Sequence, residues 1–318
     1  MVIGRNEGER LRSCLLSVVP QASLVVYVDS GSTDGSPALA RALGAEVTDL
    51  DMSVPFTAAR ARNEGFRHVQ RLLPDAQFVQ FVDGDCEVAA TWMGVATSFL
   101  EANPNVAAVC GRRRERFPER SLYNRLCDAE WDTPIGETKS CGGDVLMRTA
   151  ALAAVGGYRD DMIAGEEPEL CVRLRARGWR IWRLDAEMTL HDAAMTRWSQ
   201  WWRRTTRTGY AYAEGVALHG APPERHRVRA SRSAWFWGAG LPAAILLSAL
   251  ILGPAALLAF LVYPAQVLRL CAKGRGPFRD RMTRALFLVL GKFPEALGQI
   301  KFLRNRRSGA IARIIEYK

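Results

Sequence analysis

Short apolar runs alternate with stretches of helical periodicity along residues 2–111. The apolar runs have the length of buried strands and are bounded by turn-forming residues. They span residues 23–31, 45–47, 76–85 and 106–111, and the helical stretches span residues 36–43, 56–73 and 91–103. Val2 and Ile3 look like the end of one more strand, either naturally short or lacking its beginning. This alternation predicts an α/β fold with a largely parallel central sheet.

Aspartates stand where two of these strands end. Asp29 lies near the end of the run of residues 23–31. Asp83 and Asp85 lie at the end of the run of residues 76–85, within the stretch FVQFVDGDCEV. Ligands of open α/β sheets bind beyond the carboxyl ends of the strands. Two carboxylates separated by Gly84 can converge on one hard divalent cation, whose open positions suit substrate phosphates. We therefore expect a cation site at this edge of the sheet.

Other segments carry chemistry suited to the same crevice. The Gly/Ser-rich turn after Asp29 can hydrogen-bond a nucleobase or a ribose, and Arg62 and Asn63 lie on a helix that can reach it. The Gly-rich turn of residues 141–148 can bring backbone close to a ligand. The pair Glu166–Glu167 precedes a basic helix. The two glutamates are either catalytic carboxylates or negative charges that only stabilise the N-terminus of the helix through its dipole.

The pattern changes after residue 195. Residues 197–215 mix Trp, Tyr and Arg, a composition typical of membrane interfaces. Residues 233–268 contain no charged residue. As one helix they would measure roughly 54 Å, against about 30 Å for the hydrocarbon core of a bilayer. Since Gly253 and Pro254 lie near the middle and basic residues flank both ends, the segment is predicted to form a transmembrane or re-entrant hairpin. A buried helical pair in a soluble protein is the alternative.

Positive charge accompanies these segments. The formal net charge is +10, which indicates an anionic partner. Residues 286–303 have amphipathic helical spacing with a kink expected at Pro294, and the basic run Arg304–Arg307 follows. This distribution suits anionic lipid, so nucleic acid is not expected as a partner. The seven cysteines lack paired spacing, which favours a reducing compartment over a disulfide framework or a structural metal. The predicted domains are a catalytic domain (1–195), an interface helix with a basic linker (196–232), the hairpin (233–270) and basic membrane-surface helices (271–318).

Six segments resemble the motifs of the family 2 glycosyltransferases. They are RNEGERLRSCLLSV, VDSGSTDGS, ARNEG, VDGDCEV, CGGDVLMR and GEEPELCVRLRARGW, and they lie between Val2 and His191. One such motif is modestly specific, whereas six in the family's order are strongly so. The resemblance implies a GT-A fold, a Rossmann-like α/β domain that binds a nucleotide sugar and has a mostly parallel central sheet.

The resemblance also implies roles for individual residues. Asp85 and Asp83 would hold Mn²⁺ or Mg²⁺ against the diphosphate, with His191 either a third ligand or a structural histidine. Glu167 aligns with the family's usual aspartate and would deprotonate the acceptor hydroxyl, and Glu166 is the second candidate for this base. The residues that would bind the nucleotide sugar are Asn6, Glu7, Asp29, Arg62, Asn63, Asp83, Gly143 and Asp144.

Two departures from the family pattern narrow the prediction. Many relatives carry a second aspartate after the one at position 29, where this chain has Ser30, so base recognition would rest on Asp29 alone. Processive synthases carry Gln-x-x-Arg-Trp, whereas residues 200–204 read QWWRR. A single hairpin also leaves little room for a polymer channel. The transfer of one sugar is therefore favoured.

The sequence thus predicts an inverting, metal-dependent glycosyltransferase of the inner membrane, with its catalytic domain on the cytoplasmic side. It would move one sugar from a nucleoside-diphosphate sugar, with a UDP-sugar favoured, to a lipid-linked or glycan acceptor in exopolysaccharide or cell-envelope glycan synthesis. Membrane lipid would be a further partner. Two alternatives stay open: a polyprenyl-phosphate sugar synthase, whose anionic acceptor needs no base, and a non-catalytic scaffold that binds nucleotide sugar or glycan.

Overall fold

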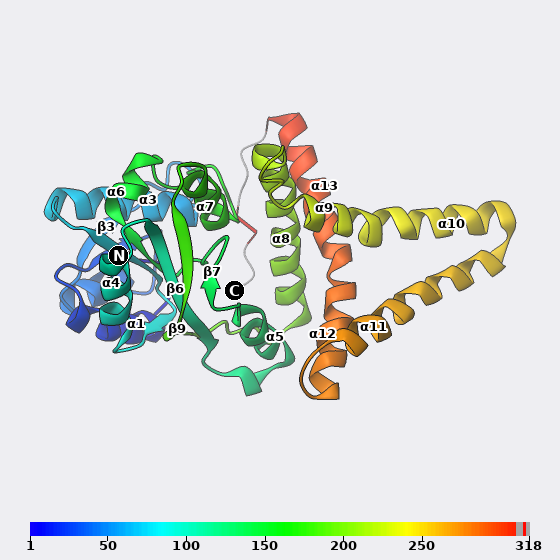
Figure 1. The fold of residues 1–318 in the computed structure, drawn as a ribbon, viewed down its shortest axis with the longest axis horizontal. Coiled ribbons are helices and arrows are strands. Elements are labelled where there is room, and N and C mark those ends of the chain that lie inside the picture. Colours follow the sequence, from blue (N-terminus) through cyan, green and yellow to red (C-terminus); the bar gives the residue numbers. More distant parts are fainter. Residues whose placement is uncertain (310–313, 316–318) are drawn as a thin grey trace. The chain divides into compact units, whose positions relative to one another are not determined.

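The chain folds as two units in the computed structural model, which describes residues 1–309 and 314–315 (Figure 1). The first unit comprises Met1–Thr196, and the second begins at Arg197. The first combines strands and helices, whereas the described part of the second is helical.

The first unit is built around one sheet. Its strands are β1 (Val2–Gly4), β2 (Val26–Asp29), β3 (Glu46–Asp49), β4 (Phe78–Asp83), β5 (Cys86–Val88), β6 (Val106–Glu115), β7 (Gly136–Glu137), β8 (Val145–Arg148) and β9 (Arg180–His191). Their order is β3-β2-β1-β4-β8-β6-β9-β5, and β7 pairs with β9. The first four strands of that order are parallel, as are β6 and β9, whereas β8 runs antiparallel to both its neighbours. Parallel β1, β2 and β4 therefore end at one edge.

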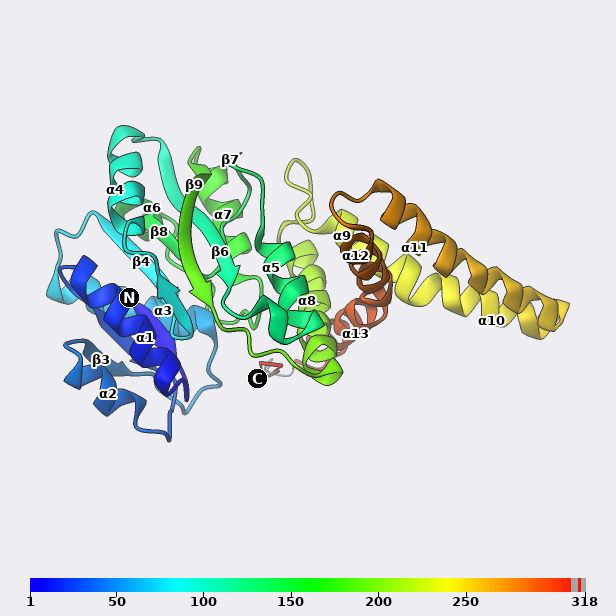
Figure 2. The same ribbon diagram turned by 90° about the horizontal axis from the view of Figure 1, so that it is seen from below.

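Helices cover both faces of this sheet (Figure 2). They are α1 (Glu9–Val18), α2 (Ser36–Ala42), α3 (Ala58–Leu72), α4 (Trp92–Ala102), α5 (Leu122–Trp131), α6 (Thr149–Ala154) and α7 (Glu166–Ala176). One apolar cluster includes Phe66 of α3 and Leu170 of α7, and a second includes Leu15 of α1 and Trp92 of α4. Two apolar layers hold the sheet from both sides, so the loops at its edge start from fixed positions.

The α/β fold predicted from the sequence is confirmed. One strand is longer than predicted: the run of residues 106–111 continues as β6 to Glu115. Residues 112–115 pair with β9 although they are charged. A strand that lines a polar site loses its apolar signature, and the hydrophobic pattern therefore stopped too early.

The second unit contains a helical hairpin (Figure 1). Its elements are α8 (Trp198–His219), α9 (Val228–Trp235), the π-helical turn η3 (Phe236–Gly240), α10 (Leu241–Leu252), the 3-10 helix η4 (Pro254–Leu261), α11 (Val262–Lys273), α12 (Phe278–Leu290) and α13 (Lys292–Ser308). Two continuous helical stretches, Val228–Leu252 and Pro254–Lys273, are long and apolar enough to cross a membrane, and little of either is buried. Gly253, with a φ of 96°, separates them. The chain thus turns at the glycine-proline pair.

The helix predicted over residues 286–303 is divided between two helices. The helix is interrupted at Gly291, between α12 and α13, three residues before Pro294. A proline distorts the turn that precedes it, so this interruption agrees with the kink expected from Pro294. Pro294 lies in the first turn of α13, where a helix does not need its N–H. The helix α13 buries Glu295 and Gln299. Its partly exposed apolar residues are Leu297, Ile300 and Leu303.

Candidate active site

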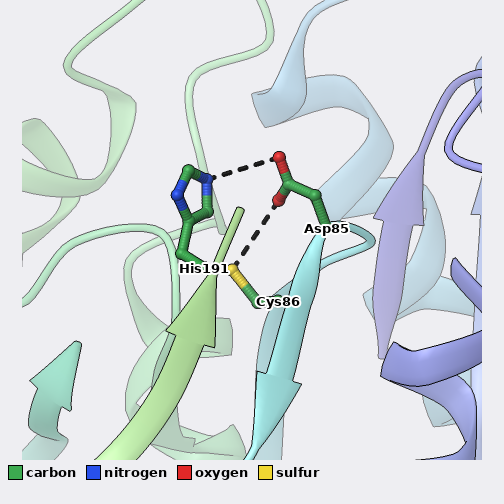
Figure 3. Close-up of side chains that lie close together, drawn as sticks. All are labelled: Asp85, Cys86 and His191. Carbon is green, nitrogen blue, oxygen red and sulfur yellow. Dashed lines mark hydrogen bonds and ion pairs between the residues drawn. The ribbon is translucent and has the colours of Figure 1, made fainter. Parts of the chain in front are cut away.

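Strand pairing brings two distant segments together at the edge of the sheet. The strand β5 starts directly after Asp85 and pairs antiparallel with the end of β9, so that Cys86 lies opposite His191. Figure 3 shows the imidazole and the carboxylate facing one another. The Nε2 atom of His191 lies 3.3 Å from Oδ2 of Asp85, and the thiol of Cys86 donates to Oδ1 at 3.7 Å. The predicted residues Asp85 and His191 therefore share one site.

These side chains fit a small divalent cation. The candidate ligand atoms of Asp85, Cys86 and His191 all lie within 4.8 Å of one another. Adjacent ligands of an octahedral magnesium ion, each about 2.0–2.1 Å from it, are roughly 3 Å apart, which is close to the 3.3 Å between Asp85 and His191. Burial, with the nearby charge of Arg113, lowers the pKa of His191, so a neutral ring nitrogen is available as a ligand. Burial raises the pKa of Cys86 well above its ordinary value, and a protonated thiol is a poor partner for a hard cation.

Asp83 is neutralised by two arginines. Its carboxylate oxygens lie 2.7 Å from the guanidinium of Arg62 and 3.1 Å from that of Arg113. Burial works against ionisation of this carboxyl, but the two arginines outweigh it and hold the pKa of Asp83 well below its usual range. Asp83 is therefore a charged residue that already has two counter-ions.

The Gly-rich turn before β8 reaches the same place. Asp144 is buried, and its carboxylate accepts hydrogen bonds from the backbone N–H of Asp83 at 3.0 Å and from the hydroxyl of Thr189 at 2.8 Å. It also forms an ion pair with Arg113 at 3.1 Å. A Cβ on Gly143 would lie 2.7 Å from a guanidinium nitrogen of Arg62 and 2.9 Å from a carboxylate oxygen of Asp83, so a side chain there would displace this ion pair. In the structure Asp144 orders the end of β4, and its contact with a nucleotide sugar stays a prediction.

Three residues of the site were missed in the sequence: Arg113 and Glu115 on the extension of β6, and Trp131 at the end of α5. The guanidinium of Arg113 lies 5.1 Å from the ring centroid of Trp131. That ring meets His191 edge-on, with 4.8 Å between centroids. Glu115 lies on the other side, its Oε2 3.9 Å from Nδ1 of His191. Four charged residues directly after an apolar strand were the available signal, since alternate residues of a strand share a face.

Loops at the ends of β1 and β2 are tied to each other. Asn6 accepts a hydrogen bond from the N–H of Thr33 at 2.7 Å, and its own N–H donates to the hydroxyl of Ser32 at 2.9 Å. The buried carboxylate of Asp29 accepts hydrogen bonds from the N–H of Ser32 at 2.7 Å and from the hydroxyl of Tyr27 at 2.9 Å. Asp29 thus organises the turn that was expected to receive the nucleobase.

The predicted nucleotide residues at this edge come from neighbouring strands. The strand β1 pairs in parallel with both β2 and β4, so Asp29 and Asp83 lie at the same edge of the sheet. Glu7 follows β1 and forms an ion pair with Arg10 at 2.8 Å. Asn6, Glu7, Asp29 and Asp83 therefore lie at the same edge of the sheet, and their contact with a nucleotide stays a prediction.

Arg62 and Asn63 of α3 serve different contacts. Arg62 bridges Asp83 at 2.7 Å and Glu166 at 2.6 Å, and so connects the two acidic motifs. The amide of Asn63 donates to the carbonyl oxygen of Tyr158 and accepts from its N–H, both at 2.8 Å. Asn63 therefore fixes the loop between α6 and α7, and its part in nucleotide binding stays a prediction.

The helix α7 opens with two glutamates in unlike surroundings. Glu166 is paired with Arg62. Glu167 is only 2% exposed, and its Oε1 accepts hydrogen bonds from the backbone N–H of Cys141 at 2.7 Å and from the thiol of Cys171 at 2.9 Å. Its Oε2 is buried and has no hydrogen-bond partner among the described residues. Because burial outweighs the two donors, the pKa of Glu167 is raised. The raised pKa makes Glu167 a stronger base than an ordinary carboxylate, and Oε2 is the oxygen that has no donor among the described residues.

Known proteins resemble the chain over this same region. Residues 1–149 match the family model described as Glycosyl transferase family 2. Over these residues the first unit is similar to the family 2 glycosyltransferases. A curated family relative, the succinoglycan biosynthesis protein ExoA of Rhizobium meliloti, is 29% identical over 189 residues, which make up 56% of this chain and 55% of the relative. A TPR repeat-containing protein of Synechococcus elongatus matches over 59 residues, 15% of its length. The chain thus spans about half or less of the curated relatives that it matches.

Solved glycosyltransferases share the family fold. The mannosyltransferase PcManGT from Pyrobaculum calidifontis, solved with GDP-Man and Mn²⁺, has a TM-score of 0.62 at 21% identity, over 94% of this chain and 86% of that one. Glucosyl-3-phosphoglycerate synthase from Mycobacterium tuberculosis, solved with Mg²⁺ and UDP, has a TM-score of 0.51 at 18% identity, over 70% and 79%. The predicted GT-A fold is confirmed. Since the family match ends at residue 149, the roles of Glu166, Glu167 and His191 rest on their geometry.

Proposed function

We propose that the protein is an inverting, metal-dependent glycosyltransferase that moves one sugar from a nucleoside-diphosphate sugar, with a UDP-sugar favoured, to a lipid-linked acceptor. The name of the Rhizobium relative supports a place in exopolysaccharide or cell-envelope glycan synthesis. The observation that carries the proposal is a division of labour within one unit: Asp85 and His191 fit a cation, and Glu167 is a buried carboxylate with an unengaged oxygen.

Asp85 and His191 are the residues that would hold Mn²⁺ or Mg²⁺. When bound, such an ion neutralises charge on the nucleoside diphosphate as it leaves. Arg113 supplies a further positive charge beside them, 3.1 Å from both Asp83 and Asp144. A guanidinium binds phosphate oxygens strongly and in a bidentate manner. We expect Arg113 to exchange one of its carboxylates for the diphosphate of the donor.

Glu167 is the general base in this proposal. Inverting displacement at the anomeric carbon needs a group that accepts the proton of the attacking hydroxyl. The raised pKa of Glu167 strengthens it as a base, and its Oε2 has room for the proton. Glu166 is less suited because its Oε1 lies 2.6 Å from Arg62. A prepared base favours a hydroxyl acceptor over polyprenyl phosphate, which is already an anion.

The nucleoside would lie along the loops after β1 and β2. Asp29, Asn6 and Glu7 would contact the base and Asp83 the ribose, because these residues share the edge at which parallel strands end. The turn at Gly143 would let backbone approach the sugar closely, since a side chain there would meet Asp83.

The hairpin of the second unit would attach the protein to the membrane. Leu250, Ile251 and Leu252 are 83%, 79% and 78% exposed, and residues 233–268 carry no charge. Water-soluble proteins rarely expose so much contiguous apolar surface, whereas a bilayer would cover it. Basic residues flank both ends of the hairpin, which favours the cytoplasmic side for both. Nucleotide sugars and the cytoplasmic face of lipid-linked acceptors are available there.

Nucleotide release from a panel of donors tests the proposal. Detergent-purified protein with Mn²⁺ is incubated with UDP-, GDP- and dTDP-sugars, and slow hydrolysis of one donor, lost in EDTA, is expected. Glu167→Gln should abolish this turnover without weakening donor binding. If no donor is bound or hydrolysed, the result favours the alternative of a non-catalytic scaffold. Near-normal transfer to polyprenyl phosphate by Glu167→Gln would favour the synthase alternative.

A further inference from the structure

Cys171 lies one helical turn after Glu167, on the same side of α7. Its thiol is buried and donates to Oε1 of Glu167 at 2.9 Å. Burial raises the pKa of Cys171 well above its ordinary value, so the thiol keeps its proton. The backbone N–H of Cys141, in the loop before β8, donates to the same oxygen at 2.7 Å. Two donors from separate segments thus act on a single carboxylate oxygen.

The second oxygen of Glu167 is in the opposite situation. Oε2 is buried, and no hydrogen-bond donor of the described chain reaches it. A carboxylate can turn about its last bond, and either oxygen can then face a substrate. Donors on Oε1 restrict that rotation and leave Oε2 as the oxygen without a hydrogen-bond donor among the described residues.

We propose that Cys171 is a positioning residue for the general base: its thiol anchors one oxygen of Glu167 so that the other takes the proton of the acceptor. This inference rests on the proposed function, since it needs Glu167 to act as the base. In the step, the O–H bond of the acceptor breaks and the proton passes to Oε2. The acceptor oxygen forms a bond to the anomeric carbon, while the bond from that carbon to the diphosphate breaks and its electron pair leaves with the diphosphate. Cys171 neither gains nor loses a proton.

The choice of a thiol affects the strength of the base. A hydrogen bond to the charged form of a carboxyl group lowers its pKa, and a thiol is a weaker donor than a hydroxyl. Burial raises the pKa of Glu167, and the donors at Cys171 and Cys141 moderate that rise. A weak donor therefore orients the carboxylate while it removes little basicity.

Other ionisable groups surround this pair, and all of them stay in place when Cys171 is replaced. Burial keeps the phenol of Tyr158 and the thiol of Cys141 protonated, because it raises the pKa of both. A shift in the acid limb of the pH profile of kcat/KM in a Cys171 variant would therefore report a change in the pKa of Glu167. The groups that face the pair are Glu166 and Arg175 of α7, Arg62 of α3, Cys110 of β6, and the loop residues Tyr158 and Cys141.

The pH profile of kcat/KM for nucleotide release tests the inference. Wild type, Cys171→Ala and Cys171→Ser are compared, with the sugar nucleotide that wild type hydrolyses fastest in the panel of UDP-, GDP- and dTDP-sugars. Alanine removes the donor, so the acid limb should move to higher pH and kcat should fall about tenfold to a hundredfold. Serine restores a stronger donor, so kcat should recover and the limb should move to lower pH.

Cys271→Ala, which removes a buried thiol from α11 in the second unit, is the matched control, and its profile should equal that of wild type. If both Cys171 variants lose activity with the acid limb unmoved, the thiol contributes only packing and the inference is overturned. An inactive Glu167→Gln together with unmoved Cys171 limbs would overturn this inference alone. A fully active Glu167→Gln would overturn the base assigned in the proposed function.

Thermal unfolding gives a second readout that needs no turnover. A double-mutant cycle of Cys171→Ala and Glu167→Gln measures the coupling between the two side chains. The coupling should be larger at pH 8 than at pH 5, because the thiol binds an ionised carboxylate more strongly than a protonated one. Absence of coupling at both pH values would overturn the inference, whatever the donor assay shows.

Discussion

The carboxylates of the candidate site differ in the charged and polar groups that surround them. Asp83 faces two guanidinium groups, and the pKa of this carboxyl is held far down. Asp85, two residues later, faces the imidazole of His191. Glu167 is buried and accepts hydrogen bonds from the thiol of Cys171 and the N–H of Cys141, and burial raises its pKa. The neighbouring groups, and not the residue type, thus distinguish Asp83 as a counter-ion, Asp85 as a candidate metal ligand and Glu167 as a candidate base.

Replacing Arg113 with Met should lower kcat/KM for donor hydrolysis by about 10²–10³-fold, as the loss of a single group that stabilises developing charge does. The variant loses the positive charge beside the diphosphate, and Asp83 and Asp144 lose a counter-ion. Arg114→Met is the control, because Arg114 pairs with Glu187 at the surface, at 2.8 Å. The measurement is steady-state kinetics at saturating Mn²⁺. Equal kcat/KM values for the two variants would contradict the role of Arg113.

Glu167→Gln should stabilise the folded protein as pH rises. Burial raises the pKa of Glu167 in the folded state, so its contribution to stability is complete below the unfolded value of about 4.5 and is lost as pH rises through the folded value. Glutamine escapes this loss. Each kcal/mol regained raises Tm by about 2–4 °C for a domain of this size. Thermal melts from pH 5 to pH 8 should show a gap between the two proteins that opens with pH, and a constant gap would refute the explanation.

At the scale of elements, strand ends were predictable and strand partners were not. The apolar run up to Val82 followed by Asp83 is a local signal, and it located the edge of the sheet correctly. The pairing of β5 with β9, which sets Asp85 beside His191, depends on register between distant segments. The resemblance to family 2 indicated His191, and the charged run after the apolar part of β6 could have indicated Glu115, whereas Trp131 had no local signal. Their positions depend on the paths of β6 and α5.

The helices α8 and α13 pack with their backbones in contact. A Cβ on Gly209 would overlap the carbonyl oxygen of Glu295, and one on Gly298 would overlap that of Thr206. Gly209→Ala should therefore destabilise the second unit by about 1–3 kcal/mol through overpacking. Gly94→Ala in α4 is the control, because a Cβ there meets nothing within 4 Å and alanine favours a helix. Differential scanning calorimetry in detergent would count against this packing if both variants melted like wild type.

A charge introduced into the hairpin should reduce membrane binding only if the hairpin lies in lipid. Leu250→Asp adds a charge at a position that is 83% exposed, which a soluble protein would tolerate. In a bilayer a charge disfavours insertion, by about 2.5–3.5 kcal/mol at the centre of a helix and by less near its end, where Leu250 lies. More protein should therefore leave the membrane in a carbonate wash. Leu16→Asp, at a position of α1 that is 56% exposed, is the control and should not alter partitioning. Equal partitioning of both variants would argue for a soluble hairpin.

For the whole molecule, we propose that the two units serve substrates that come from different phases. The first has the fold and the polar edge of an enzyme for a water-soluble sugar nucleotide, and the second exposes a long uncharged hairpin. The net charge of +10 would favour both a diphosphate and an anionic lipid surface. Composition indicated a change of character after residue 195 and an uncharged segment over residues 233–268. The sugar and the acceptor are chosen by loop shapes that follow from tertiary packing, beyond the reach of any local pattern.

The central claim, a cation held by Asp85 that in turn binds a nucleoside diphosphate, is tested most directly by calorimetry. UDP, GDP and dTDP are titrated into detergent-purified protein with and without Mn²⁺, for wild type, Asp85→Asn and the control Asp75→Asn, whose exposed side chain precedes β4 at its opposite end. One nucleotide should bind wild type and the control only with Mn²⁺, and Asp85→Asn should weaken that binding roughly 100-fold or more. Binding that needs no metal, or that Asp85→Asn retains in full, would contradict the account.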